Sequence, residues 1–269
     1  MEVANISQEE LDCIQKEVQI HNMVRSDYCV KLYHSIKTKS SIYMFQDYCN
    51  GFDLAMLLKL RGRITQSEVS QILKQVVLGC RDIWTLSVIH RDIKLANILL
   101  HFPEHPEVNT MRTAEKQQFL KHFDLSQGNF KAVISDFGLS TIVYEGTNSQ
   151  LSICGTPLYS SPQLLKKRGY SYKVDIWAIG IMCYELLCGK TPFHSFEMKD
   201  LVAKINKGDY TVTLKEPILI ECVLFLSQCL QANESDRIDV NELCEHPFFK
   251  LNDRDTFLDK KAYTEELER

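Results

Sequence analysis

The sequence has no excess of charge of either sign and no apolar run long enough to cross a membrane. It carries 31 Lys and Arg against 35 Asp and Glu, for a net charge of -4. Its longest apolar run, residues 176–188, is too short for a bilayer and contains Glu185. The first residues lack the basic-then-apolar pattern of a secretory signal. We therefore expect no membrane insertion and no nucleic-acid partner.

Cysteines are present, but none forms a Cys-x-x-Cys pair. The 10 cysteines are spread along the chain, most of them within apolar helical patterns. This distribution is typical of buried free thiols in a reducing compartment rather than of a zinc site or a disulfide framework. The sequence therefore predicts a cytoplasmic protein.

The chain also lacks internal repeats, and its periodicity predicts a mixture of helices and a few strands. With 269 residues, 45% of them hydrophobic, it can form one large domain or two lobes. Ser7 with Glu10 and Thr65 with Glu68 are capping boxes, which predict helices that begin after Ser7 and Thr65. Further helices are predicted over 113–123, 175–188, 218–230 and 240–244, and strands over 30–35, 41–48 and 130–135.

Residues 89–100 form a short, highly charged stretch between two apolar segments. They include Arg91, Asp92, Lys94 and Asn97, while Val88-Ile89 and Ile98-Leu99-Leu100 flank them. A solvated loop does not need such apolar flanks, and a core segment does not tolerate this much charge without a use for it. The pattern predicts a rigid polar loop between buried strands, which is how a protein fixes catalytic groups.

Several motifs in a fixed order resemble the serine/threonine type of the eukaryotic protein kinase family. The stretch 90–97 reads His-Arg-Asp-x-Lys-x-x-Asn, and 136–138 reads Asp-Phe-Gly. Thr-Pro-x-Tyr-x-x-Pro at 156–162, Asp-x-Trp at 175–177 and a late Arg237 follow. Within the family, residues 47–51 and 90–100 resemble the autophagy-initiating (unc-51-like) kinases, and calcium-regulated kinases share much of this pattern.

The resemblance implies an α+β, two-lobed kinase fold with a truncated small lobe. Residues 1–48 would be a partial small lobe with one helix, two strands and the start of the hinge. Residues 49–249 would be the large lobe, and 250–269 a charged C-terminal tail. The 101–129 segment is an insertion, because kinases usually cross from the Asn to the Asp-Phe-Gly with a short hairpin. We interpret it as a surface loop in preference to a functional element.

The resemblance also assigns the catalytic and metal-binding residues. Asp92 takes the place of the base near the attacking hydroxyl, and Lys94 supplies a cation near the transferring phosphate. Asn97 and Asp136 supply the amide and carboxylate oxygens that Mg²⁺ prefers.

By the same resemblance, ATP would bind between the lobes. Glu17 corresponds to the glutamate of the small-lobe helix. The main chain of Asp47 and Cys49 would hydrogen-bond the adenine, and Leu99 would form the floor beneath it. Gln46 falls at the gatekeeper position, where an apolar residue is commoner.

Regulatory and supporting residues follow from the family pattern. Arg91 would receive a phosphate on the activation segment, with Ser152 as the expected site and Thr156 in the same segment. Asp175 would brace the catalytic loop. Gln163 stands where the family has a Glu that pairs with the late Arg, so Arg237 would lack a charge partner.

Two functions stay open at this point. The Gly-rich loop and the strand-3 Lys of the family are absent from these residues, and His21 replaces an apolar residue expected to pack toward Phe137. One interpretation is an ATP- and Mg²⁺-dependent kinase that phosphorylates Ser or Thr of protein substrates, with lowered activity. The alternative is a pseudokinase that acts as a binding scaffold.

Overall fold

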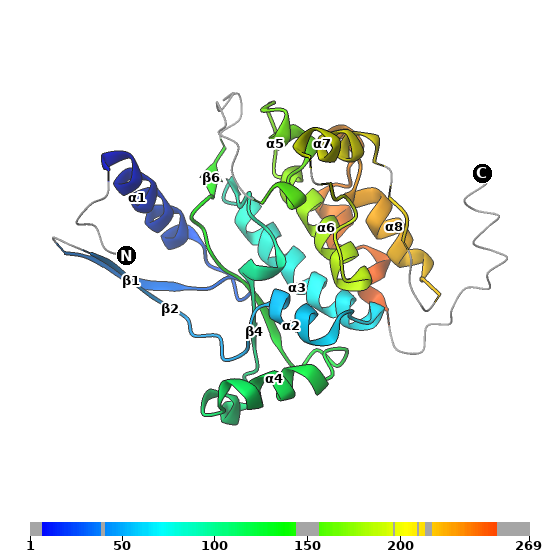
Figure 1. Ribbon diagram of the computed structural model, residues 1–269. Coiled ribbons are helices and arrows are strands. Elements are labelled where there is room, and N and C mark those ends of the chain that lie inside the picture. The colour runs from blue at the N-terminus through cyan, green and yellow to red at the C-terminus, as the bar shows by residue number, and fades with distance from the viewer. Residues whose placement is uncertain are drawn as a thin grey trace.

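A small N-terminal part and a larger helical body make up the structure. The computed structural model describes residues 7–38, 41–143, 156–195, 197–208, 210–212 and 217–251. Figure 1 shows the helix α1 and the strands β1 and β2 on one side, and the remaining helices gathered on the other. We call residues 7–48 the N-terminal part and residues 49–251 the helical body.

The N-terminal part consists of one helix and one antiparallel hairpin. Helix α1 (Gln8–Met23) begins after Ser7, whose side chain accepts a hydrogen bond from the amide of Glu10, so the predicted capping box is confirmed. Strands β1 (Leu32–Lys37) and β2 (Ile42–Gln46) pair from Lys37 with Ile42 to Leu32 with Gln46. The strand predictions were correct in place and about two residues out at the ends.

Two long helices cross in the centre of the helical body. Helix α3 (Gln66–Trp84) has the predicted capping box at Thr65, and α6 (Lys173–Cys188) ends at Gly189 in the left-handed conformation. Nearly all of α6 is buried, as its uniformly apolar sequence predicts. The other helices are α2 (Leu54–Arg61), α4 (Thr113–His122), α5 (Pro162–Leu165), α7 (Met198–Lys207), α8 (Ile220–Cys229) and α9 (Val240–Cys244).

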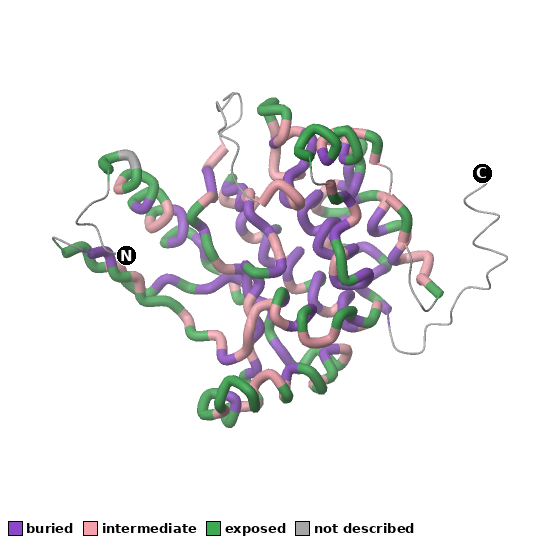
Figure 2. Tube along the Cα trace, in the orientation of Figure 1, coloured by how far each residue is buried: buried purple, intermediate pink, exposed green. Residues whose placement is uncertain are grey.

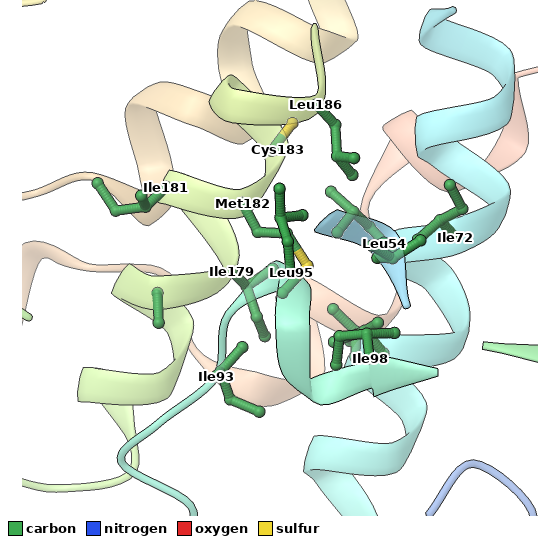
Figure 3. Packing of buried hydrophobic residues seen from close by; sticks show 14 of the residues in the cluster. Leu54, Ile72, Ile93, Leu95, Ile98, Ile179, Ile181, Met182, Cys183 and Leu186 are labelled. Atoms are coloured by element: carbon green, nitrogen blue, oxygen red, sulfur yellow. The ribbon is translucent and has the colours of Figure 1, made fainter. Parts of the chain in front are cut away.

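Two short sheets place the charged loop between the central helices. Strand β3 (Val88–Ile89) pairs with β6 (Thr141–Ile142), and β4 (Ile98–His101) pairs with β5 (Lys131–Ile134). Figure 3 shows Leu95 and Ile98 pointing into the apolar layer that contains Leu54 and Met182. Residues 90–97 are therefore held at both ends by buried segments, as predicted. Short 3₁₀ turns are η1 (Leu95–Asn97), η2 (Pro106–Asn109), η3 (Pro157–Tyr159), η4 (Glu234–Asp236) and η5 (Pro247–Lys250).

The 101–129 segment is a packed part of the body rather than a loose surface loop. Its helix α4 matches the predicted helical stretch, and Leu120 and Leu125 are fully buried. The guanidinium of Arg61 donates to the carbonyl of Leu120, at 2.7 Å, and to that of Phe123. The interpretation as a surface loop missed this packing, because the contacts come from residues far away in the sequence.

The described residues contain no helix that is both long and apolar enough to cross a bilayer. The described residues include nine cysteines, all of them free thiols and most of them buried. The free, mostly buried thiols agree with the prediction from the cysteine pattern.

His246 generates a prediction about pH. Its ring is buried against Phe225, and its Nδ1 accepts a hydrogen bond from the amide of Phe248. Burial lowers the pKa of His246 to about 4. The folded state therefore binds this proton more weakly than the unfolded state, whose pKa is about 6.5. The stabilisation is complete above that value and is lost as pH falls toward 4.

We expect the free energy of unfolding to fall between pH 7 and pH 5, with about 1 kcal/mol or more of the loss due to His246. His246→Asn keeps an acceptor for the Phe248 amide and should flatten the dependence in urea titrations. The exposed His122→Asn is the control and should leave the slope unchanged. Equal slopes in all three proteins would contradict the prediction.

Candidate active site

Asp92 lies at the centre of the candidate site with one of its carboxylate oxygens unpaired. The residue is 6% exposed. Its Oδ2 accepts hydrogen bonds from Lys94 Nζ at 2.6 Å and from Asn97 Nδ2 at 2.9 Å. Its Oδ1 is buried and has no hydrogen-bond partner among the described residues. A buried carboxylate oxygen without a partner is costly, so the Oδ1 of Asp92 is a candidate acceptor for a hydrogen-bond donor beyond the described residues, such as a ligand.

Lys94 connects the charged loop to the segment around Thr156. Besides its bond to Asp92, its Nζ lies 3.4 Å from Thr156 Oγ1. The ammonium is partly exposed, with a quarter of the side chain accessible. The Lys94 ammonium therefore contacts both Asp92, the candidate base, and Thr156.

Asn97 and Asp136 are brought side by side by the pairing of β4 with β5. The carbonyl of Asn97 accepts hydrogen bonds from the amide of Ser135 at 2.9 Å and from its hydroxyl at 3.0 Å. Asp136 follows directly, with a φ of 65° and an exposed side chain whose Oδ1 accepts from the amide of Gly138. Since Nδ2 of Asn97 is engaged by Asp92, its amide oxygen remains for a hard cation together with the Asp136 carboxylate.

His90 is a buried, neutral histidine that fixes the geometry before Asp92. Its Nδ1 accepts a hydrogen bond from the amide of Asp92, and its Nε2 lies 3.2 Å from the carbonyl of Ser135. This pairing places the single proton on Nε2. Burial lowers the pKa of His90, in keeping with the neutral ring.

Asp175 braces the loop from helix α6. Its Oδ2 accepts from the amide of His90 at 2.9 Å and from Trp84 Nε1 at 3.0 Å, and its Oδ1 accepts from the amide of Arg91 at 2.8 Å. Arg91 has a φ of 66°, a conformation that costs energy for a residue with a side chain. The bonds from Asp175 compensate that cost and fix the backbone immediately before Asp92.

A stack of three rings joins the N-terminal part to the site. The His21 ring lies 4.6 Å from the ring of Phe137, which in turn lies 5.3 Å from that of His90. His21 therefore packs toward Phe137, in the position expected of an apolar side chain. Its Nε2 lies 2.6 Å from the carbonyl of Val30, so the polar atom is satisfied although the residue is buried.

Glu17 points toward the Asp-Phe-Gly turn. Its Oε2 lies 3.5 Å from the place that a Cβ would occupy on Gly138. Burial, and next the nearby Asp136 carboxylate, raise the pKa of Glu17. The structure thus brings the predicted glutamate to the predicted metal-binding aspartate.

The segment between β2 and α2 offers unpaired main-chain groups. In the described part of the chain, no group donates to the carbonyl of Asp47, and none pairs with the main chain of Cys49. The amide of Asp47 bonds the carbonyl of Lys31, which fixes the start of the segment. Leu99 is half-buried and Gln46 is exposed.

The regulatory and supporting residues differ in how far the structure describes them. Ser152 lies outside the described residues. The side chain of Arg91 donates to the carbonyl of Leu139 at 2.6 Å and to Tyr170 Oη at 3.2 Å. It therefore already contacts the segment that follows the Asp-Phe-Gly turn.

Arg237 is buried, and Gln163 is one of its hydrogen-bond acceptors. The guanidinium donates to Gln163 Oε1 at 3.0 Å and to the carbonyls of Lys173 and Gln231. Burial lowers the pKa of Arg237 to about 10. As predicted, Gln163 accepts a hydrogen bond where a carboxylate would have formed an ion pair.

Three contacts were not expected from the sequence. The first is the hydrogen bond that the indole N–H of Trp84 donates to Asp175. The need of a buried indole for an acceptor is the signal that points to such a bond. The Tyr159 hydroxyl donates to Glu185, and Lys16 Nζ donates to Thr141 Oγ1 at 3.1 Å. Neither of these two has a local signal, because the partners are distant in the sequence.

The side chains around Asp92 indicate the type of reaction that the site supports. A buried carboxylate beside an ammonium, with an amide side chain and a second carboxylate on adjoining segments, can orient a hydroxyl and hold a hard cation, and phosphoryl transfer needs both. The comparisons with known proteins agree, since residues 1–249 match the family model described as protein kinase domain.

Known relatives include three animal kinases. The chain is 29% identical to mouse serine/threonine-protein kinase PLK2 over 236 residues, which cover 88% of this chain and 30% of PLK2. It is 30% identical to Drosophila melanogaster serine/threonine-protein kinase polo over 252 residues, 93% of this chain and 38% of polo. It is 29% identical to Caenorhabditis elegans serine/threonine-protein kinase plk-2 over 245 residues, 91% of this chain and 34% of plk-2.

The chain belongs to the serine/threonine protein kinase family. It spans between 30% and 38% of the length of these curated relatives.

The bonds of Asp175 generate the prediction for this subsection. Asp175→Asn removes one acceptor oxygen and turns an amide toward a donor. We expect a loss of about 1–3 kcal/mol in the free energy of unfolding, measured by urea titration. Amide exchange at His90 and Arg91 should accelerate. The exposed Asp27→Asn should stay within about 0.5 kcal/mol of the parent protein. Unchanged stability in Asp175→Asn would show that the brace contributes nothing.

Proposed function

We propose that the chain transfers the γ-phosphate of ATP to serine or threonine hydroxyls of protein substrates. The observation that carries this proposal is the unpaired, buried Oδ1 of Asp92. Its partner oxygen is held by Lys94 and Asn97, so the carboxylate has one fixed orientation. Such an oxygen suits the hydroxyl of a substrate side chain, which donates one hydrogen bond and then loses its proton.

In this proposal each side chain has one task. Asp92 orients the attacking hydroxyl and accepts its proton. Lys94 places positive charge near the transferring phosphoryl group, where negative charge develops. Asp175 and His90 touch neither substrate nor phosphate, and they hold the backbone that presents Asp92.

Asn97 and Asp136 are the residues that would hold Mg²⁺. Their oxygens fit a hard cation, because an amide oxygen and a carboxylate lie on adjoining segments joined through Ser135. When bound, Mg²⁺ would neutralise phosphate charge. Glu17 faces the same place, and its raised pKa agrees with an uncompensated carboxylate beside Asp136.

The nucleotide would lie between the N-terminal part and the helical body. The open main-chain groups of Asp47 and Cys49 support adenine binding there, above Leu99. We further propose that residues 1–48 belong to the small lobe and that residues 49–249 are the large lobe with its 101–129 insertion. Residues 252–269 of the expected tail lie outside the described residues.

A pseudokinase that acts as a scaffold is the second candidate. Two observations favour it: His21 occupies the ring stack, and Gln163 replaces an acidic partner of Arg237. The oxygens around Asp92 and Asp136 favour the enzyme. The relatives reported above are polo-like kinases, so the closer resemblance to unc-51-like or calcium-regulated kinases stays a prediction.

Nucleotide binding and phosphoryl transfer test this proposal separately. We expect Mg-ATP to raise the melting temperature of the chain and a Ser/Thr peptide mixture to be phosphorylated. Asp136→Asn should lose the magnesium-dependent shift because it removes a metal-binding carboxylate. Asp92→Asn should keep the shift and lower transfer about 100-fold or more. Binding without transfer in the parent protein would favour the scaffold, and transfer unaffected by Asp92→Asn would contradict the proposed base.

Phosphorylation of Ser152 is a further expectation. A phosphate there would add about two negative charges opposite Arg91 and order the activation segment through charge-assisted hydrogen bonds. Ser152→Ala should then lower activity, while Ser149→Ala should not. Equal activity and equal proteolytic sensitivity of both variants would show that Ser152 has no regulatory role.

A further inference from the structure

The 101–129 segment, which we call the insert, contributes a group of aromatic rings to the main hydrophobic core. The rings of Phe102, Phe119 and Phe123 contact one another, and the His105 ring lies against the latter two. All five ring–ring distances lie between 4.8 and 5.3 Å. Contacts of this kind fix the helix α4 relative to the start of the insert.

On one side, the insert is anchored to the helical body. Arg61 bonds the last carbonyls of α4 and also forms an ion pair with Glu68 at 2.6 Å. Glu68 in turn accepts a hydrogen bond from the amide of Leu125. Both members of the ion pair are largely buried, so this anchor is poorly accessible to solvent.

On its other side, the insert begins against the segment that joins the two parts of the molecule. We call residues 47–51 the hinge. The side chain of Asn50 is 1% exposed; its Nδ2 donates to the carbonyls of Phe102 and His105, and its Oδ1 accepts from the amide of Phe102 at 2.8 Å. A Cβ on Gly51 would lie 2.6 Å from the carbonyl oxygen of Leu100, so only glycine allows this approach.

Helix α4 returns to the same hinge through one lysine. Lys116 Nζ donates to the carbonyl of Asn50 at 3.2 Å and to Tyr48 Oη at 3.3 Å, and it lies 5.9 Å from the centre of the Tyr48 ring. Figure 1 shows α4 next to β4, below the chain that leads from β2 to α2. Much of the outer surface of α4 is exposed, as Figure 2 shows, so the helix bridges the hinge and the body from outside.

The positions of these contacts suggest what they do. Lys116 contacts residues 48 and 50, which alternate with Asp47 and Cys49. The insert therefore occupies polar groups of Tyr48 and Asn50, while in the described part of the chain no group donates to the carbonyl of Asp47 or pairs with the main chain of Cys49.

We propose that the insert is a brace for the hinge and that Lys116 is a positioning residue which fixes residues 48–50 before a nucleotide binds. The consequence for ATP rests on the proposed function; the fixation of the hinge does not. A hinge fixed beforehand loses less conformational entropy on binding, so the brace raises nucleotide affinity without touching the nucleotide.

Three lysine variants test the brace in the free protein. Lys116→Met keeps the aliphatic stem and removes the donors, Lys116→Arg restores a donor, and the exposed Lys121→Met of the same helix is the matched control. Hydrogen exchange should accelerate about fivefold at the amides of Asn50 and Gly51 in Lys116→Met only, as the loss of about 1 kcal/mol would produce. Exchange in α8 should stay unchanged in all three.

Nucleotide measurements then test the consequence. In Lys116→Met we expect the Kd or KM for Mg-ATP to rise about fivefold with kcat unchanged, and Lys116→Arg to recover most of the affinity. Unchanged exchange at Asn50 and Gly51, or equal effects of Lys116→Met and Lys121→Met, would overturn the brace. If the parent protein binds no Mg-ATP, the proposed function fails, while the exchange experiment still decides whether the insert fixes the hinge.

Discussion

The carboxylate of Asp175 is the point on which the rest of the candidate site depends. Three N–H groups from two segments converge on it: the indole of Trp84 and the amides of His90 and Arg91. A buried carboxylate with three donors is well compensated, whereas each of these donors would be left unsatisfied without it. The unfavourable φ of Arg91 and the orientation of Asp92 both follow from this arrangement.

The catalytic loop is linked to the N-terminal part by contacts between uncharged rings rather than by ion pairs. His90 has its two nitrogens engaged by the backbone, which leaves its face for Phe137, and Phe137 stacks on His21. Burial lowers the pKa of both histidines, so the stack carries no charge near neutral pH. The ring contacts thereby fix the position of α1 relative to the catalytic loop. At acidic pH, protonation of both His21 and His90 would oppose this packing, because the two positive charges would repel each other.

Features that depend on local sequence were predicted well. The capping boxes at Ser7 and Thr65 and the uniformly apolar α6 are local signals, and the structure has them where expected. The order of the charged motifs was enough to place Asp92 beside Lys94 and Asn97, since all three lie on one short loop.

Contacts with distant partners were predicted only where the family resemblance supplied them, as for Asp175 with the catalytic loop and Gln163 with Arg237. Nothing near Trp84 in the sequence shows that Asp175 will accept a hydrogen bond from its indole, and nothing near Lys116 shows that it will bond the carbonyl of Asn50. The insert was interpreted as a surface loop for the same reason. The residues that anchor it lie elsewhere in the sequence. They are the ion pair of Arg61 with Glu68 and the buried side-chain amide of Asn50.

The charge balance of the site links these observations to one another. Glu17 and Asp136 face the same turn, and burial together with their mutual repulsion makes Glu17 take up a proton more readily than a free glutamate. Lys94 is paired with Asp92, and among the described residues it forms no hydrogen bond or ion pair with either of these carboxylates. A cation held at Asp136 would offset the repulsion between Glu17 and Asp136, which a neutral ligand would not do.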